Sequence, residues 1–362
     1  MVFGEYSQIL FFSGYRRFSR TDFAMHEDAE LEQAPKKLTL IVPNIHERER
    51  IDKFLARQVE NATRNKIQTA IDEARILVNG KAIKANHKLA PGDVIDITFT
   101  RPPAPEMKAE NIPLDIVYED EFLMVINKSA GMVVHPAFGN WTGTLANAVL
   151  HHTQNALSDL NDDEMRPGIV HRLDKDTSGL IVVAKDNNTH HILAKQFAAR
   201  TTEKIYLALV FGVPKHERGT IETNIARSKR DRKVMATYPF NSADGKPAIT
   251  DYEVVENYGF FSLLSLTLHT GRTHQIRVHL QHIGHPILGD EVYGGRTIRP
   301  MGFPQSDAFL KNLLILLPRQ ALHAAQLSFV HPRTAKKVSF SAALPNDITQ
   351  AIEKIKTITR FS

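Results

Sequence analysis

The sequence contains no cysteine. Disulfides, thiolate-bound zinc, iron–sulfur clusters and cysteine nucleophiles are therefore excluded. Long apolar runs are missing too: residues 313–317 form one of the longest, with about five apolar residues, whereas a membrane helix needs roughly 18. We therefore expect a cytoplasmic protein without a membrane segment, a disulfide scaffold or a cysteine catalyst.

Positive charge is in slight excess over negative charge. Lys and Arg number 45, Asp and Glu number 40, and the formal net charge is +5 with histidine neutral. Apolar residues make up 42% of the chain and charged residues 23%, a balance typical of folded domains. At roughly 150 residues per domain, this length predicts two or three domains. A mildly basic protein favours nucleic acid as a partner.

Residues 1–36 differ in composition from the rest. The first 24 residues are rich in Arg and Ser and poor in acids, as in a transit peptide. No sustained amphipathic helix is visible, which favours a disordered extension, or translation from Met25, over a transit peptide. A secretory signal is not indicated, because the apolar run at residues 9–12 is short and no basic residue precedes it.

Residues 37–100 have the pattern of a small α/β domain. Apolar residues recur at helical spacing over residues 50–57 and 64–75, and Asn79-Gly80 then predicts a hairpin turn. This order of two helices and a small sheet resembles the S-four type RNA-binding module. The resemblance implies that the basic residues of the helices contact RNA, although a charged helix face is often simply solvated. The candidate contacts are Arg50, Arg64 and Lys66.

A proline-rich segment separates this domain from the remainder of the chain. Residues 101–113 read as a semi-rigid linker. Residues 114–345 then alternate between strand and helix patterns. Strands are predicted at residues 123–127, 180–185 and 204–211, and helices at residues 144–151, with a threonine cap, and 189–199. In the last segment, residues 346–362, one face of a helix carries Ile348, Ile352 and Ile355.

The densest group of reactive side chains lies in residues 168–180, a polar loop that leads into an apolar strand. Asp174 is flanked there by Arg172 and Lys175, and nearby cations keep a carboxylate ionised. An ionised carboxylate acts as a nucleophile or a base. Taken alone, the run is equally compatible with a polar loop whose charges pair among themselves.

Asp174 and Asp176 also match the start of a magnesium-dependent phosphatase of the haloacid dehalogenase type. Gly289-Asp290 could supply the distal acidic motif of that site. The site needs a second distal carboxylate, however, and residue 294 is glycine. His171 and Arg172, shortly before Asp174, are polar where the motif requires a continuous apolar strand. This alternative is therefore disfavoured.

A second motif, residues 270–280, reads Thr-Gly-Arg-Thr-His-Gln-Ile-Arg-Val-His-Leu. It predicts a turn, a threonine cap and a helix that ends at Gly284, with Ile276, Leu280 and Ile283 packed inward. Together with the first motif it resembles the RluA family of pseudouridine synthases. Further segments that match in the order of that family are residues 204–209, 245–248, 285–294 and 319–324.

The resemblance covers about residues 114–345 and implies an α+β fold on a mixed, mainly antiparallel sheet. It implies an enzyme that isomerises uridine to pseudouridine in RNA, with no metal and no other cofactor. An S-four type module also precedes this domain in the large-subunit members of the family, so the expected partner is ribosomal RNA of the large subunit or of its assembly intermediates. We expect a monomer.

The resemblance also assigns individual residues. Asp174 corresponds to the catalytic aspartate, Arg277 to the basic residue paired with it, and Tyr206 to the tyrosine that stacks on the target base. Arg172 corresponds to the arginine that enters the space left by a base extruded from its helix. Without the resemblance, a strand tyrosine is more often half-buried packing.

Two other clusters have weaker interpretations. Residues 227–233 are rich in cations and form either a solvated loop or a phosphate-binding one, with Arg227, Lys229 and Arg230 as candidate contacts. Five histidines between residues 269 and 285 suggest zinc, but neither an acidic partner nor an HExxH pattern accompanies them. An RNA-binding assembly factor without turnover remains the other alternative, against which the three catalytic matches argue.

Overall fold

The computed structural model describes residues 9–10, 36–43, 49–59, 64–99, 107–136, 140–154, 168–231, 234–298 and 305–359. The chain forms two compact units, Met1–Ala104 and Pro105–Ser362. The division falls inside the predicted linker, and residues 107–113 of that segment belong to the second unit. There the Glu110 N–H donates to the Asn147 carbonyl, and the Asn147 side chain donates to the Lys108 carbonyl.

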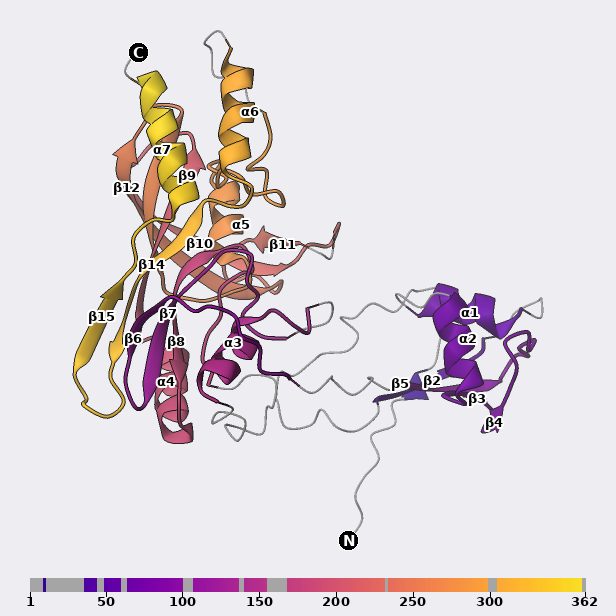
Figure 1. Cartoon of the computed structure of the whole chain (residues 1–362). Helices are drawn as coiled ribbons and strands as arrows, with labels where there is room; N and C mark the ends of the chain where they lie inside the picture. The colour runs from indigo at the N-terminus through magenta and orange to yellow at the C-terminus, as the bar shows by residue number, and fades with distance from the viewer. Residues whose placement is uncertain are drawn as a thin grey trace. The chain divides into compact units, whose positions relative to one another are not determined.

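The first unit is a five-stranded sheet with two helices packed on it (Figure 1). Its strands run in the order β1-β2-β5-β3-β4. The elements are β1 Ile9–Leu10, β2 Lys36–Ile41, α1 Ile51–Gln58, α2 Arg64–Asp72, β3 Ile76–Val78, β4 Lys81–Ala82 and β5 Val94–Phe99. Both predicted helices are present, and their apolar residues share one core with the sheet.

The predicted hairpin is also present. Val78 pairs with Lys81 across Asn79 and Gly80, whose φ angles of 49° and 73° are those that a tight hairpin turn requires. Strand β2 was not predicted, although its alternating apolar residues are typical of a half-buried strand. Within the segment expected as an extension, Ile9–Leu10 pairs with β2, while residues 1–8 and 11–35 lie outside the described residues.

The second unit is built on a ten-stranded sheet. The strands run in the order β11-β10-β12-β13-β9-β14-β8-β7-β6, and β15 pairs with β14. Every neighbouring pair is antiparallel except β14 and β8, so the predicted mixed, mainly antiparallel sheet is confirmed. The bounds are β6 Ile116–Glu119, β7 Leu123–Lys128, β8 Ser178–Ala184, β9 Glu203–Phe211, β10 Arg218–Arg227, β11 Met235–Tyr238, β12 Lys246–Asn257, β13 Phe261–Leu268, β14 Leu322–Val330 and β15 Lys337–Ser341.

Helices pack on both faces of this sheet. The bounds are α3 Leu145–His152, α4 Asn187–Ala199, α5 Gln275–His282, α6 Ser306–Leu316 and α7 Asn346–Thr359. Met124 and Ile126 of β7 pack in a core shared with α3, whereas Leu123 and Val125 face the opposite side with Leu193 of α4. With both faces covered, β8 is buried along its whole length, which explains its unbroken apolar run.

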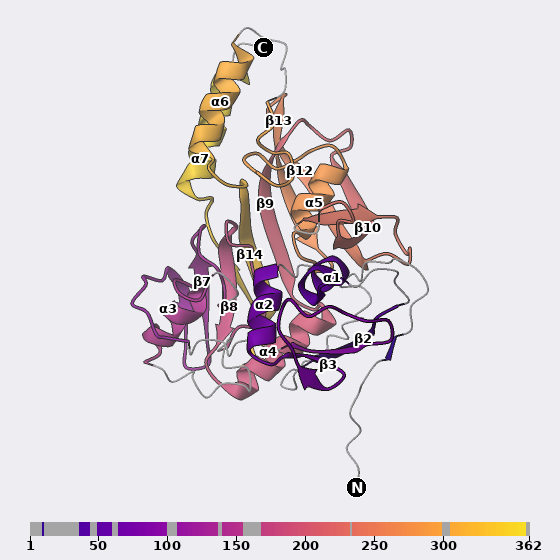
Figure 2. The same ribbon diagram turned by 90° about the vertical axis from the view of Figure 1, so that its right-hand side faces the viewer.

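The predicted helix ends agree with the structure in part. The Thr144 side chain accepts from the Asn147 N–H and so opens α3 as predicted. The three predicted isoleucines of α7 are buried, and α7 lies beside α6 (Figure 2). In the described residues, no helix is both long and apolar enough to cross a bilayer.

The threonine cap predicted for α5 is wrong. The residue before α5 is His274, in the left-handed region at a φ of 55°, and its side chain caps nothing. The Thr270 hydroxyl donates instead to the side-chain oxygen of Gln275, which also accepts from the Arg272 N–H. The Gln275 side chain thus holds the turn. The helix ends near Gly284, as predicted.

Candidate active site

Asp174 lies in the loop that leads into β8, and the backbone around it is tied down. The Thr177 N–H donates to the Asp174 carbonyl, which closes a turn. The Lys175 carbonyl accepts from the Gly131 N–H and from the Lys128 ammonium. The Asp176 carbonyl accepts from the Arg319 guanidinium. A side chain on a backbone held in this way keeps its direction during a reaction.

Arg277, on α5, bridges two carboxylates. Its Nη1 donates to Asp174 Oδ2 at 3.0 Å, and its Nε and Nη2 donate to the two oxygens of Asp290 at 2.7 and 3.0 Å. Burial alone would lower the pKa of Arg277, but the hydrogen bonds and charges of Asp290 and Asp174 outweigh it and raise this pKa. Asp290 is fully buried. The two-point pair with Asp290 therefore fixes the guanidinium that meets Asp174.

His274 faces the same carboxylate from the start of α5. Its Nε2 lies 3.9 Å from Asp174 Oδ2, and its Nδ1 lies 2.9 Å from the Tyr293 hydroxyl. Burial lowers the pKa of His274, against the opposing charge of Asp174. A histidine with a lowered pKa is neutral at neutral pH. Arg277 is therefore the cation that directly balances Asp174.

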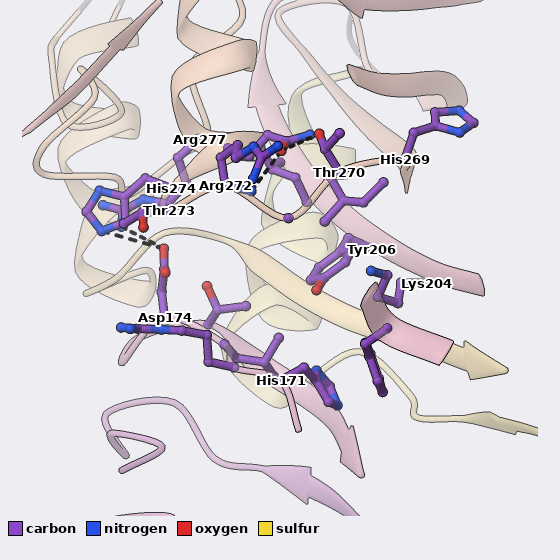
Figure 3. A pocket seen from close by; sticks show the side chains of 18 of the residues that line it. His171, Asp174, Lys204, Tyr206, His269, Thr270, Arg272, Thr273, His274 and Arg277 are labelled. Atoms are coloured by element: carbon purple, nitrogen blue, oxygen red, sulfur yellow. Dashed lines mark hydrogen bonds and ion pairs between the residues drawn. The ribbon is translucent and has the colours of Figure 1, made fainter. Parts of the chain in front are cut away.

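A pocket of about 420 Å³ opens beside Asp174 (Figure 3). The loop before β8, the end of α4, the start of α5 and strand β9 all contribute to its lining. Tyr206 of β9 reaches into it and is otherwise buried. Burial, and then the charge of Asp174, raise the pKa of Tyr206. Its phenol is therefore protonated throughout the neutral range.

The structure brings four of the predicted site residues to this pocket: Asp174, Tyr206, Arg277 and Arg172, the last with an exposed side chain. Arg227 ends β10, and Lys229 and Arg230 follow it in the turn toward β11, outside the pocket lining. The Lys229 ammonium donates to Asp244 at 2.8 Å.

The remaining predicted contacts lie in the first unit. Arg50 precedes α1 and forms a two-point pair with Asp52. Arg64 and Lys66 lie in the first turn of α2, and both are exposed. All three side chains thus sit on the helical part of the small domain.

The histidines of the two motifs have structural partners. His171 Nε2 accepts from the Val182 N–H, and burial lowers its pKa to about 3. His279 is buried with its two ring nitrogens against the hydroxyls of Thr223 and Thr250, and burial lowers its pKa to about 4. Within the described residues, no group of three or more potential metal-binding side chains comes together.

Three charged residues that support the site were not predicted to do so. Asp290 figures in the sequence only as the distal motif of the disfavoured phosphatase, but its oxygens are occupied by Arg277 and two backbone N–H groups. Arg319 joins the Asp176 carbonyl to Asp347 of α7 through a two-point ion pair. The third residue is Lys128.

Lys128 is a buried lysine at the end of β7. Its ammonium donates to the carbonyls of Ser129, Met132 and Lys175 at 2.8, 2.9 and 3.0 Å. Burial lowers its pKa from 10.5 to about 7, although the charge of Asp176 opposes the shift.

We expect replacement of Lys128 by Met to lower stability more at pH 9.5 than at pH 7. In the window from about pH 7 to 10.5 the unfolded chain holds the Lys128 proton and the folded chain releases it. Stability from this group therefore rises with pH in that window, by up to about 1.4 kcal/mol per pH unit. The variant lacks this rise, and the carbonyls of Ser129, Met132 and Lys175 lose the hydrogen bond from the lysine, although the Gly131 N–H still donates to Lys175.

The measurement is the urea midpoint at both pH values. Lys195→Met removes an exposed lysine of α4 and serves as the control. An equal loss of stability at pH 7 and pH 9.5 for Lys128→Met would contradict the argument.

Comparison with known proteins shows the family to which this chain belongs. The sequence model of the RNA pseudouridylate synthase family matches residues 122–282, and that of the S4 domain matches residues 49–95. An uncharacterized RNA pseudouridine synthase of Chlorobaculum parvum is 60% identical over 325 residues, or 90% of this chain and 99% of that protein. The chain belongs to the RNA pseudouridine synthase family, and it is an isomerase that acts on RNA.

Another relative and a solved structure are also similar to this chain. The ribosomal large subunit pseudouridine synthase D of Neisseria meningitidis is 40% identical over 339 residues, which cover 93% of this chain and 85% of that protein. The solved structure of human RNA pseudouridylate synthase domain containing 4 matches with a TM-score of 0.51 and 26% identity. That match covers 67% of this chain and 92% of the human one. The family and fold expected from the sequence are confirmed.

Proposed function

We propose that this enzyme converts uridine to pseudouridine in helix 69 of large-subunit (23S) ribosomal RNA, with Asp174 as the catalytic carboxylate. The observation that carries the proposal is the fixed pair of Asp174 and Arg277 in a pocket that Tyr206 also lines. Identity to a large-subunit synthase D over most of the chain supports ribosomal RNA. The resemblance of residues 289–296 to synthase D implies helix 69.

The reaction breaks the bond between uracil N1 and the ribose, turns the base, and joins C5 to the same ribose carbon. Asp174 serves this chemistry by attacking the sugar or by removing a proton beside the anomeric carbon. Both routes need an ionised carboxylate. The Arg277 guanidinium donates a charge-assisted hydrogen bond to Asp174 at 3.0 Å, and such a bond favours the ionised form. Tyr206 stacks on the base and relays the final proton transfer: its phenol oxygen takes the proton that leaves C5 while its own phenol proton passes to N1.

The target base reaches Asp174 only after it leaves its stack. Extrusion costs a few kcal/mol, part of which a cation that fills the vacated space offsets. Arg172 is exposed and lies two residues from Asp174, a position suited to that role. Arg227, Lys229 and Arg230 then contact phosphates farther along the RNA, where Lys229 exchanges Asp244 for a phosphate.

The first unit supplies additional RNA contacts through Arg50, Arg64 and Lys66. The S4 match supports RNA binding by this unit.

We further propose that the chain acts as a cytoplasmic monomer in the processing of ribosomal RNA. The domain limits that we propose are residues 37–100 for this module and 114–345 for the catalytic domain, with 346–362 as the closing helix.

Removal of residues 1–104 should weaken RNA binding at least tenfold while leaving the rate at saturating RNA within a few-fold. Contacts to phosphates lower Kd but do not change the chemistry in the pocket. Their loss therefore weakens the binding of RNA and leaves the rate of the bound complex unchanged. The measurement compares Kd and the single-turnover rate of the shortened and full chains. Unchanged Kd would assign this unit another role.

The experiment that tests the function is carbodiimide mapping of pseudouridine on unmodified large-subunit RNA. New reverse-transcription stops in helix 69 with the wild type would support both reaction and target. Stops elsewhere would contradict the target alone. If neither free RNA nor assembling subunits gave stops, the assembly-factor alternative would replace the proposed function.

A further inference from the structure

The charges that line the pocket are unbalanced. Its lining includes one carboxylate, Asp174, and several Arg and Lys side chains. Asp174 already pairs with Arg277, so it balances none of the other cations. In the part of the chain that the structure describes, neither Arg200 nor Lys204 forms an ion pair or donates a side-chain hydrogen bond. Both line the pocket.

Lys204 is half-buried beside aromatic rings. Its Nζ lies 5.6 Å from the centre of the Phe197 ring, on which the His171 ring also stacks. Burial, and then the charge of Arg200, lower the pKa of Lys204. His171 is neutral, so neither of these two rings carries a negative charge that would balance the ammonium. Holding a cation there costs free energy that a bound anion would offset.

Arg200 reaches the same end of the pocket from the end of α4. It is the C-terminal cap of that helix, with a φ of 58°, and its side chain is exposed. The helix terminus offers it only a partial negative charge. An arginine guanidinium without an ion-pair partner and a lysine ammonium beside it are the usual donors to a phosphate group.

The position of this pair relative to Tyr206 fits one nucleotide. Lys204 and Tyr206 lie two residues apart on β9, so their side chains leave the strand on the same face, about 7 Å apart. Figure 3 shows both side chains on the pocket wall, with Asp174 across from Tyr206. A base held against Tyr206 would have its sugar toward Asp174 and a flanking phosphate within reach of Lys204.

We propose that Arg200 and Lys204 form a binding subsite for one phosphodiester of the substrate RNA, next to the extruded uridine. The inference rests on the proposed use of this pocket for an extruded uridine. A phosphodiester is the ligand class because the two donors are cationic, the rings beside Lys204 are neutral, and the family acts on RNA. The subsite would fix the backbone at the target and so orient the sugar toward Asp174.

The test measures binding, not turnover. The helix 69 stem-loop is made with phosphodiesters throughout and in versions that each carry one neutral methylphosphonate in the loop. Kd is measured for the full-length wild type, Lys204→Met, Arg200→Gln and the exposed-lysine control Lys195→Met. We expect one methylphosphonate to weaken wild-type binding about tenfold, the size of one charge-assisted hydrogen bond.

Lys204→Met and Arg200→Gln should each bind the phosphodiester RNA about tenfold more weakly and lose little more with that same methylphosphonate. Lys195→Met should behave like the wild type. Equal tenfold losses in wild type and both variants would show that the phosphate contacts another group and would overturn the proposal, as would wild-type affinity in both variants. A wild type that shows this pattern but forms no pseudouridine would contradict the proposed function and leave the subsite standing.

Discussion

Replacement of Asp174 by Asn should reduce pseudouridine formation by at least about a thousandfold while leaving RNA binding intact. The amide keeps the size of the side chain and can still accept a hydrogen bond from Arg277, but it neither attacks the sugar nor removes a proton. A positioned catalytic group of this kind contributes roughly 10² to 10⁴ in rate, and more when it forms a covalent bond. The RNA should bind as tightly or slightly more tightly, because a negative charge leaves a pocket lined by cations.

The measurement is the single-turnover rate on the RNA in which the wild type forms pseudouridine, together with Kd for the same RNA. Asp176→Asn is a matched control, because it removes a second carboxylate from the same loop, two residues away. Asp176 contacts Arg319 through its backbone carbonyl, which the substitution keeps. That control should keep its rate within a few-fold. Asp174→Asn with more than a tenth of the wild-type rate would exclude Asp174 as the catalytic group.

The elements that carry a strong local pattern are the ones that the sequence predicted. Residues 180–184 of strand β8 form an unbroken apolar run, and α7 has three isoleucines on one face, so burial alone determines their form. Asn79-Gly80 determines a turn type through its positive φ angles. Strand β2, by contrast, was not predicted, and its antiparallel partner β5 lies more than 50 positions farther along the chain.

The candidate site shows the same contrast between what a local sequence pattern predicts and what depends on distant contacts. The two motifs predicted Asp174 and Arg277, yet 103 residues separate these partners, and no local pattern shows that they touch. The supporting residues were missed for this reason: Lys128, Asp290 and Arg319 act through contacts that only the folded sheet creates. The threonine cap failed because the Gln275 side chain satisfies the turn, which depends on where β12 presents the Ile249 carbonyl.

Replacement of Arg277 by Met should destabilise the second unit as well as inactivate it. Asp290 is fully buried, so no solvent hydrates its charge. Arg277 is the cation that pairs with it. Removing one partner of a buried ion pair costs about 3–5 kcal/mol, because the other charge remains buried and uncompensated. We therefore expect a lower urea midpoint for the second unit and a loss of pseudouridine formation together.

A second substitution separates these two effects. In Arg277→Met with Asp290→Asn, the orphaned charge is gone, and most of the lost stability should return, since a neutral amide still accepts from the Val292 and Tyr293 N–H groups. Activity should not return, because Asp174 still lacks its cation. The two readouts are the urea midpoint and the single-turnover rate of both variants. Recovery of activity along with stability would show that Arg277 acts only through the fold, whereas stability without activity places its charge in the reaction.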